Sequence, residues 1–218
     1  MNTDSHFEAR RVVSAAGRDM PVPMQERSRE TANRFIQAAT ELLHHKTFAE
    51  LSVAELAEAA GRSIGVFYQR FGNKDEFLDV LLTAYLEFSN GWRSSYEPQG
   101  NLAEVYSAFL ERGYQNLRDN RNLWHAALER AALDREFWDR YGHFRMEGAK
   151  FTRRALERAL GREFTDEERR RLALASQVFN SVINNSIING PGPLMLENDD
   201  FFPELKNIAL TIAKLPEA

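Results

Sequence analysis

The sequence predicts an all-α protein of about nine helices, with a three-helix segment containing a helix-turn-helix followed by a larger helical region. Two long tracts, 24–97 and 99–190, contain no proline and are rich in Ala, Leu, Glu and Arg. Proline disrupts helix interiors because it removes a backbone donor, whereas these other residues favour helices. No run alternates apolar and polar residues as a half-buried strand would. These observations together indicate packed helices without a sheet.

Composition limits the possible classes of protein. The chain has 218 residues, 28 Lys and Arg against 32 Asp and Glu, and a formal charge of −4. The absence of cysteine excludes disulfides, thiolate metal sites and a cysteine nucleophile, and it fits a reducing compartment. No apolar run approaches a membrane span, and the N-terminus lacks the apolar segment of a secretory signal. We therefore expect a cytoplasmic protein without a membrane segment.

The first expected elements form a compact N-terminal domain. Residues 1–27 have no apolar period, so a flexible tail is expected there, and helical periodicity runs from Ser28 to near Lys46. A short helix opens at Ser52, which has the capping-box spacing to Glu55. Further helices are expected at about 64–70 and from 73 through 86, with glycines between them.

The remaining helices are expected at about 102–118, 121–132, 134–160, 166–189 and 202–215. Thr165 and Glu168 have the spacing of another capping box. The sequence therefore divides into a tail over 1–27, an N-terminal helical domain over 28–86, and a larger C-terminal helical domain over 87–218.

The segment 52–77 carries the functional signal. Two short helices joined by a tight turn at Gly61 form a helix-turn-helix, whose second helix can enter a major groove. Ser63 and Gly65 allow the backbone to approach DNA closely, whereas Phe67 and Phe71 are expected to face the first helix.

The same region carries a family pattern. Its parts are Ala38-Ala39-Thr40-Glu41-Leu42-Leu43, Phe48, Ser52-Val53-x-x-Leu56-Ala57, Ala60-Gly61-x-Ser63-x-Gly65 and Phe67-Tyr68-x-x-Phe71-x-Asn73-Lys74-Asp75-x-Phe77-Leu78. With these residues, the segment from about Arg27 to Leu86 resembles the DNA-binding domain of TetR-type transcriptional regulators. The resemblance covers somewhat over a quarter of the chain, and the C-terminal half has no comparable motif.

The resemblance implies specific DNA contacts. It implies that Ser52, Tyr68 and Lys74 contact phosphates of the DNA backbone, and that residues of the turn and the recognition helix contact bases. Among the latter, Arg62 suits guanine and Gln69 suits adenine. Val66 departs from the Thr or Ser frequent in the family, which removes a hydroxyl contact or adds a thymine-methyl contact. The expected DNA-binding residues are Ser52, Arg62, Ser63, Ile64, Gly65, Val66, Tyr68, Gln69 and Lys74.

The resemblance also implies two partners beyond a double-stranded DNA operator. The last two long helices of family members pair in a homodimer, and apolar stripes here supply Leu172, Ala175, Phe179, Val182, Ser186, Leu205, Ile208 and Ile212. Family members hold a small effector among their central helices, where this chain is unusually aromatic. The expected ligand-binding residues are Trp92, Tyr106, Tyr114, Trp124, His125, Trp138, Tyr141, His143 and Asn180. The effector is expected to be small and hydrophobic or aromatic.

The expected function is that of a ligand-responsive repressor, and two alternatives stay open. A regulator that needs no ligand, controlled by a protein partner, would use the same DNA-binding residues. An esterase is the remote alternative, because residues 61–65 match G-x-S-x-G with Ser63 as nucleophile, although that motif requires a preceding strand. His44 and His45 point about 100° apart on a helix and are poorly placed to share a metal. We expect no catalytic residue, no metal and no cofactor.

Charge is unevenly distributed along the chain. Residues 1–75 contain ten basic and ten acidic residues, so the excess of negative charge lies in the remainder. DNA binding is therefore expected to depend on a few placed residues and helix N-termini, with modest non-specific affinity.

Overall fold

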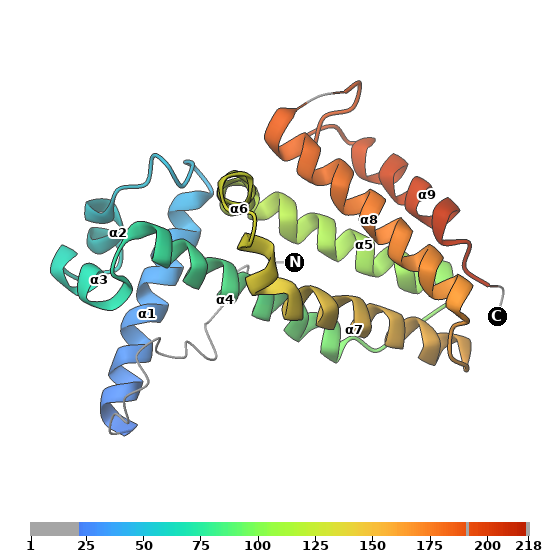
Figure 1. Ribbon diagram of the computed structural model, residues 1–218, viewed down its shortest axis with the longest axis horizontal. Coiled ribbons are helices and arrows are strands. Elements are labelled where there is room, and N and C mark those ends of the chain that lie inside the picture. Colours follow the sequence, from blue (N-terminus) through green and yellow to red (C-terminus); the bar gives the residue numbers. More distant parts are fainter. Residues whose placement is uncertain (1–21, 191, 217–218) are drawn as a thin grey trace. The chain divides into compact units, whose positions relative to one another are not determined.

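The computed structural model describes residues 22–190 and 192–216, which form nine α-helices, one 3₁₀ helix and no strand (Figure 1). The predicted all-α fold is therefore confirmed. The elements in chain order are α1 (Val22–Leu43), α2 (Val53–Ala59), α3 (Ile64–Phe71), α4 (Lys74–Ser95), α5 (Leu102–Asp119), α6 (Arg121–Leu133), the 3₁₀ helix η1 (Phe137–Tyr141), α7 (Gly142–Leu160), α8 (Asp166–Asn189) and α9 (Phe201–Ala213). Within these ranges no helix is both long enough and apolar enough to cross a bilayer.

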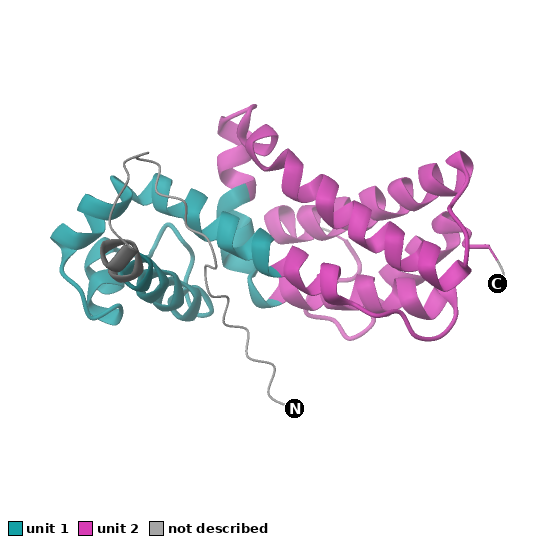
Figure 2. Ribbon diagram, turned by 90° about the horizontal axis from the view of Figure 1, so that it is seen from below, with its two compact units in different colours: residues 1–88, 119–127 teal, residues 89–118, 128–218 magenta. Residues whose placement is uncertain are grey.

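These helices belong to two compact units (Figure 2). Unit 1 contains the described residues up to Phe88 together with 119–127, and unit 2 contains 89–118 together with the described residues from Leu128 onwards. Residues 119–127 therefore belong with the N-terminal unit, although the sequence places them in the C-terminal domain. As a result, α4 and α6 each contribute residues to both units, and α5 contributes its last residue, Asp119, to unit 1.

Four phenylalanines form the centre of unit 1. Phe35 of α1 lies 5.5 Å from both Phe67 and Phe71 of α3, between ring centroids, and Phe77 of α4 lies 4.6 Å from Phe71. Edge-on and tilted contacts of this kind add to the free energy gained by burying the rings. The expected inward direction of Phe67 and Phe71 is confirmed, and these rings fix α3 against α1 and α4.

Residues 119–127 attach to unit 1 through polar and aromatic contacts. The side-chain amide of Asn122 donates a hydrogen bond of 2.7 Å to the carbonyl oxygen of Leu43, the last residue of α1. The Trp124 ring lies 5.7 Å from the Tyr85 ring, and Asn120 is buried. The last carbonyls of a helix have no partner within it, so Asn122 satisfies one of them.

In unit 2, α8 and α9 pack side by side, and residues 192–200 of the loop between them lead into α9 (Figure 1). The Tyr114 hydroxyl of α5 donates a hydrogen bond of 2.8 Å to the carbonyl oxygen of Leu196, which ties that loop to α5. The Tyr114 ring also stacks on Phe201 and Phe202 at the start of α9. The loop is therefore held by a buried aromatic group.

Two local expectations are wrong. Helix α1 begins at Val22 rather than Ser28, because Pro23 lies in the first turn, where a helix leaves backbone N–H groups unpaired in any case. The helix expected over 134–160 is interrupted, because the Asp134 carboxylate accepts the Glu136 amide and pairs with Arg140 at 2.9 Å. This local turn leads into η1, and α7 starts at Gly142. The tail expected over 1–21 lies outside the described residues.

Candidate nucleic-acid interface

The helix-turn-helix is built from two capped helices. Ser52 and Glu55 form the predicted capping box at the start of α2. The turn passes through Gly61, whose φ of +61° suits glycine. The Arg62 amide donates a hydrogen bond of 2.9 Å to the carbonyl oxygen of Ala57. The Ser63 hydroxyl oxygen then accepts the Val66 amide at 3.3 Å and caps α3. Caps at both helices define the angle at which α3 leaves the turn.

One face of α3 is open to solvent. Its exposed residues are Ile64, Gly65, Tyr68 and Gln69, while Phe67 and Phe71 are buried on the other side. Ile64 is 47% exposed and Tyr68 is 50% exposed, which is unusual for side chains of this size. A Cβ added at Gly65 would meet only the Ser63 hydroxyl oxygen, at 3.8 Å, so the backbone there is accessible. This face therefore holds two of the residues predicted to read bases, Ile64 and Gln69, together with Gly65 and the predicted phosphate contact Tyr68.

The two arginines next to this face are engaged within unit 1. A guanidinium nitrogen of Arg62 donates a hydrogen bond of 3.0 Å to the carbonyl oxygen of Gly61. Arg70 is half-buried, its guanidinium donates to the Ser28 hydroxyl, and burial lowers the pKa of Arg70. The exposed face of α3 therefore presents no charged side chain.

Lys74 is held at the start of α4. Its Nζ donates a hydrogen bond of 3.1 Å to the carbonyl oxygen of Ala49 and lies 4.8 Å from the centre of the Phe48 ring. Partial burial lowers the pKa of Lys74, and the neighbouring Asp75 and Glu55 carboxylates oppose that change. Phe48 and Ala49 therefore fix the position of the ammonium group, a role that the sequence did not reveal.

The N-terminus of α2 carries a fixed negative charge. The Glu55 carboxylate lies 2.5 Å from Lys46 Nζ and accepts hydrogen bonds from the Ser52 hydroxyl at 2.8 Å and the Ser52 amide at 2.9 Å. The ion-paired hydrogen bond from Lys46 and those from Ser52 lower the pKa of Glu55 to about 2. A phosphate bound at Ser52 would therefore lie next to a carboxylate, with Lys46 as the nearest compensating cation.

The expected dimerisation residues occupy buried, half-buried and exposed positions, and Ser186 and Ile212 are the half-buried ones. Leu172, Ala175, Phe179 and Leu205 are buried within unit 2, so they contribute to its core rather than to an exposed face. Val182 and Ile208 are 38% and 47% exposed. The stripes read from the sequence therefore include both internal and external positions.

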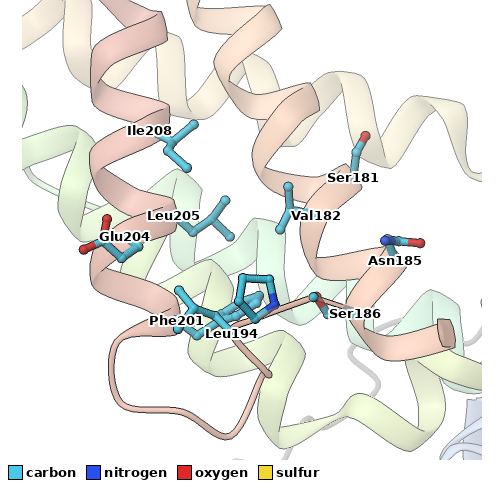
Figure 3. Close-up of a pocket in the computed structure, with 11 residues that line it drawn as sticks. Ser181, Val182, Asn185, Ser186, Leu194, Phe201, Glu204, Leu205 and Ile208 are labelled. Carbon is cyan, nitrogen blue, oxygen red and sulfur yellow. The ribbon is translucent and has the colours of Figure 1, made fainter. Parts of the chain in front are cut away.

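An open groove of about 370 Å³ lies between α8 and α9, and the exposed Val182 and Ile208 line it together with buried and half-buried residues (Figure 3). Val182 and Ser186 of α8 and Leu205 and Ile208 of α9 are among its lining residues, and Leu194 of the connecting loop closes one end. Figure 3 shows Val182 and Ile208 directed into the space between the two helices. Most of the surface of the groove is apolar.

The expected ligand-binding residues do not line this groove and have varied surroundings. Trp124 and His125 belong to unit 1, and the other seven belong to unit 2. The Tyr114 hydroxyl bonds the Leu196 carbonyl, and the Tyr106 hydroxyl lies 3.4 Å from the Ser176 hydroxyl. Burial raises the pKa of both tyrosines. The remaining five all lie in unit 2 but differ in their surroundings. Trp92, Trp138 and Tyr141 make aromatic contacts, whereas His143 and Asn180 are exposed.

The esterase alternative lacks its structural context. Ser63 follows the turn after helix α2 rather than a strand, and its hydroxyl caps α3. A hydrolase elbow requires a strand before the serine and a histidine within hydrogen-bond reach. No group of three metal-ligating side chains occurs in the described part of the chain.

The helix-turn-helix region and the fold of this chain are similar to those of known proteins. Residues 35–81 match the family model described as bacterial regulatory proteins of the tetR family. A TetR transcriptional regulator from Rhodococcus sp. RHA1 is 19% identical with a TM-score of 0.56, over 88% of this chain and 99% of that one. A tetR-family transcriptional regulator from Streptomyces coelicolor is 17% identical with a TM-score of 0.61, over 90% of this chain and 82% of that one. A comparison with curated protein sequences gives no match.

Proposed function

We propose that this chain, whose residues 35–81 match the model of the tetR family of bacterial regulatory proteins, is a ligand-responsive repressor. In this proposal a homodimer binds a pseudo-palindromic operator, and a small hydrophobic or aromatic effector releases it. The observation that carries the DNA-binding part is the exposed face of α3, which a four-phenylalanine core holds outward.

DNA recognition follows from this placement. The N-terminal residues of a recognition helix contact base edges in the major groove. Ile64, Gly65 and Gln69 would then face bases, while Lys74 and Tyr68 would contact the phosphate backbone. Phosphate contacts orient the protein, and base contacts supply the sequence preference.

The homodimer is supported by the groove between α8 and α9. Val182 and Ile208 leave apolar surface exposed there, and a second copy related by a two-fold axis would cover it. Two copies present two recognition helices, and only one separation of those helices fits both half-sites of an operator.

Ligand response would act through that separation. Unit 2 contains aromatic side chains in mutual contact, including Trp92, Tyr96 and Phe109 with centroid distances of 4.8–5.3 Å. Such side chains suit a flat apolar effector. Because α4 contributes residues to both units, an effector that favours another position of α4 would lower the affinity for the operator.

A gel-shift series tests the DNA-binding part. The full chain is titrated at low salt into the DNA upstream of its own gene and into an unrelated fragment of equal length. We expect a shift of the upstream fragment at lower protein concentration. The absence of a shift with every promoter fragment would contradict the proposal.

A second experiment separates ligand response from control by a protein partner. The melting temperature of the protein is measured against a library of aromatic and lipophilic compounds, and the compounds that raise it are added to the gel-shift assay. Release of DNA by a stabilising compound supports ligand response. If no compound both stabilises the protein and releases DNA, the regulator that needs no ligand is favoured.

A further inference from the structure

The first exposed residue of the recognition helix is apolar, and its setting assigns it a base contact. Ile64 is the first residue of α3 and is 47% exposed. Side chains of a helix tilt towards its N-terminus, which is the end that a recognition helix presents to base edges. Ile64 therefore extends from α3 in the direction in which bases would lie, and this inference rests on the proposed function.

The surroundings of Ile64 favour close approach to a base. At about 100° per residue, Ile64, Tyr68, Gly65 and Gln69 follow one another around an arc of roughly 140°. All four are exposed. Gly65 adds no side chain next to Ile64, and a Cβ at that position would meet only the Ser63 hydroxyl at 3.8 Å. Tyr68 is the bulky neighbour of Ile64 on this arc, and it lies one turn further from the N-terminus of α3, so Ile64 is the first large side chain at that end of the exposed face.

The chemistry of this arc limits what it can recognise. None of its four residues is charged, and the flanking Arg62 and Arg70 guanidinium groups donate to Gly61 and Ser28. An aliphatic side chain forms no hydrogen bond with a base edge. The apolar group that a base pair presents in the major groove is the 5-methyl group of thymine.

We propose that Ile64 recognises a thymine 5-methyl group in each operator half-site, so that the protein distinguishes thymine from uracil and from unmethylated cytosine at that position. Burial of the methyl group against Ile64 supplies the preference. Tyr68, one turn along the same face and 50% exposed, borders the contact, and Gln69 lies at the far side of the arc.

The test removes the methyl group and nothing else. The operator is obtained by selecting bound duplexes from a random library with the full chain. Each thymine in the selected half-site is then replaced in turn by uracil. Uracil keeps the base pairing and lacks only the methyl group. Binding is measured by fluorescence anisotropy. We expect a loss of affinity of about fourfold at one position in each half-site, the order of magnitude for one buried methyl group.

Variants then assign the effect to Ile64. With Ile64→Ala the thymine and uracil duplexes should bind equally at that position, because the methyl group no longer has an aliphatic partner. Ile64→Val should keep part of the discrimination, and Tyr68→Phe should keep all of it. Leu133→Ala removes an equally apolar side chain that is 86% exposed in unit 2 and should leave the discrimination unchanged.

Salt dependence provides an independent readout. The ratio of thymine to uracil affinity should stay constant between about 50 and about 200 mM salt, since an apolar contact releases no counterions. Equal binding of thymine and uracil duplexes by the wild-type protein overturns the inference and leaves the proposed function intact. Full discrimination by Ile64→Ala also overturns it. If selection enriches no duplex, the proposed function itself fails.

Discussion

Asn122 caps the C-terminus of α1: its amide nitrogen lies 2.7 Å from the carbonyl oxygen of Leu43, although 79 positions separate the two residues. The contact joins the first turn of α6 to α1, the helix whose Phe35 packs against the recognition helix α3. It is one of the contacts that residues 119–127 make within unit 1, together with that of Trp124 with Tyr85.

Replacing this cap should destabilise unit 1. Asn122→Ala leaves the Leu43 carbonyl without its side-chain donor, and the loss of one neutral hydrogen bond costs about 1 kcal/mol. We expect a lower melting temperature and faster hydrogen exchange in 119–127 and at the end of α1. Asn207→Ala, which removes an exposed asparagine of α9, is the matched control. Equal behaviour of the two variants would show that the cap does not contribute.

The capping box of α2 should make stability depend on pH in the acid range. The pKa of Glu55 is about 2 in the folded protein, against about 4.3 for an ordinary glutamate. A carboxyl group whose pKa is lower in the folded state stabilises the folded protein at pH values above its unfolded-state pKa. That contribution is lost as the pH falls through the folded-state pKa of about 2. The melting-temperature advantage of wild type over Glu55→Gln should therefore shrink between about pH 4.3 and about pH 2.

The control for this titration lies on the same helix. Glu58→Gln replaces an exposed glutamate of α2 and should follow the wild-type curve. Because the Glu55 side chain is partly open to solvent, added salt should reduce the difference between wild type and Glu55→Gln. A constant difference across the acid range would contradict the assignment of the effect to Glu55.

Lys74 should contribute to affinity without sequence preference. Lys74→Met keeps an unbranched side chain over the Phe48 ring and removes the ammonium group. For the loss of one phosphate contact, the slope of log affinity against log salt should decrease by about 0.9. Affinity should fall on operator and random duplexes alike. Lys150→Met removes an exposed lysine of α7 and should leave both slope and affinity unchanged; an unchanged slope for Lys74→Met would remove Lys74 from the interface.

A charge in the α8–α9 groove should prevent dimerisation. Ile208→Glu places a carboxylate on apolar surface that a second copy would bury, and an unpaired buried charge is strongly unfavourable. Light scattering after size exclusion should give a monomer, and operator affinity should fall. The melting of the monomer should change little, because Ile208 is 47% exposed. Leu133→Glu is the control on α6, and a dimeric Ile208→Glu would exclude this groove as the interface.

Local patterns in the sequence predict much of this structure. The spacing of Ser52 and Glu55 predicts the capping box of α2, and that of Thr165 and Glu168 predicts the box of α8, and both form. These predictions succeed because residues three apart on a helix start are in contact whatever the rest of the chain does.

Features that depend on distant residues could not be read in this way. Asn122 and Leu43 are brought together by the fold, and neither carries a local signal for the other. The direction of the Arg62 guanidinium towards Gly61 is likewise a property of the folded turn. On α8, apolar residues occupy buried and exposed faces alike, so periodicity could not separate Leu172 from Val182.

Helix α6 contributes residues to both units, and this limits where the chain can be joined to the sensor domain of another regulator. A chimera that joins the first 88 residues to a foreign sensor would lose Asn122 and Trp124, and with them the cap of α1 and the partner of Tyr85. The transplanted DNA-reading module must therefore carry 119–127 with it, or the recipient must supply an equivalent helix start. For engineers who exchange such modules, the unit of exchange is discontinuous along the chain.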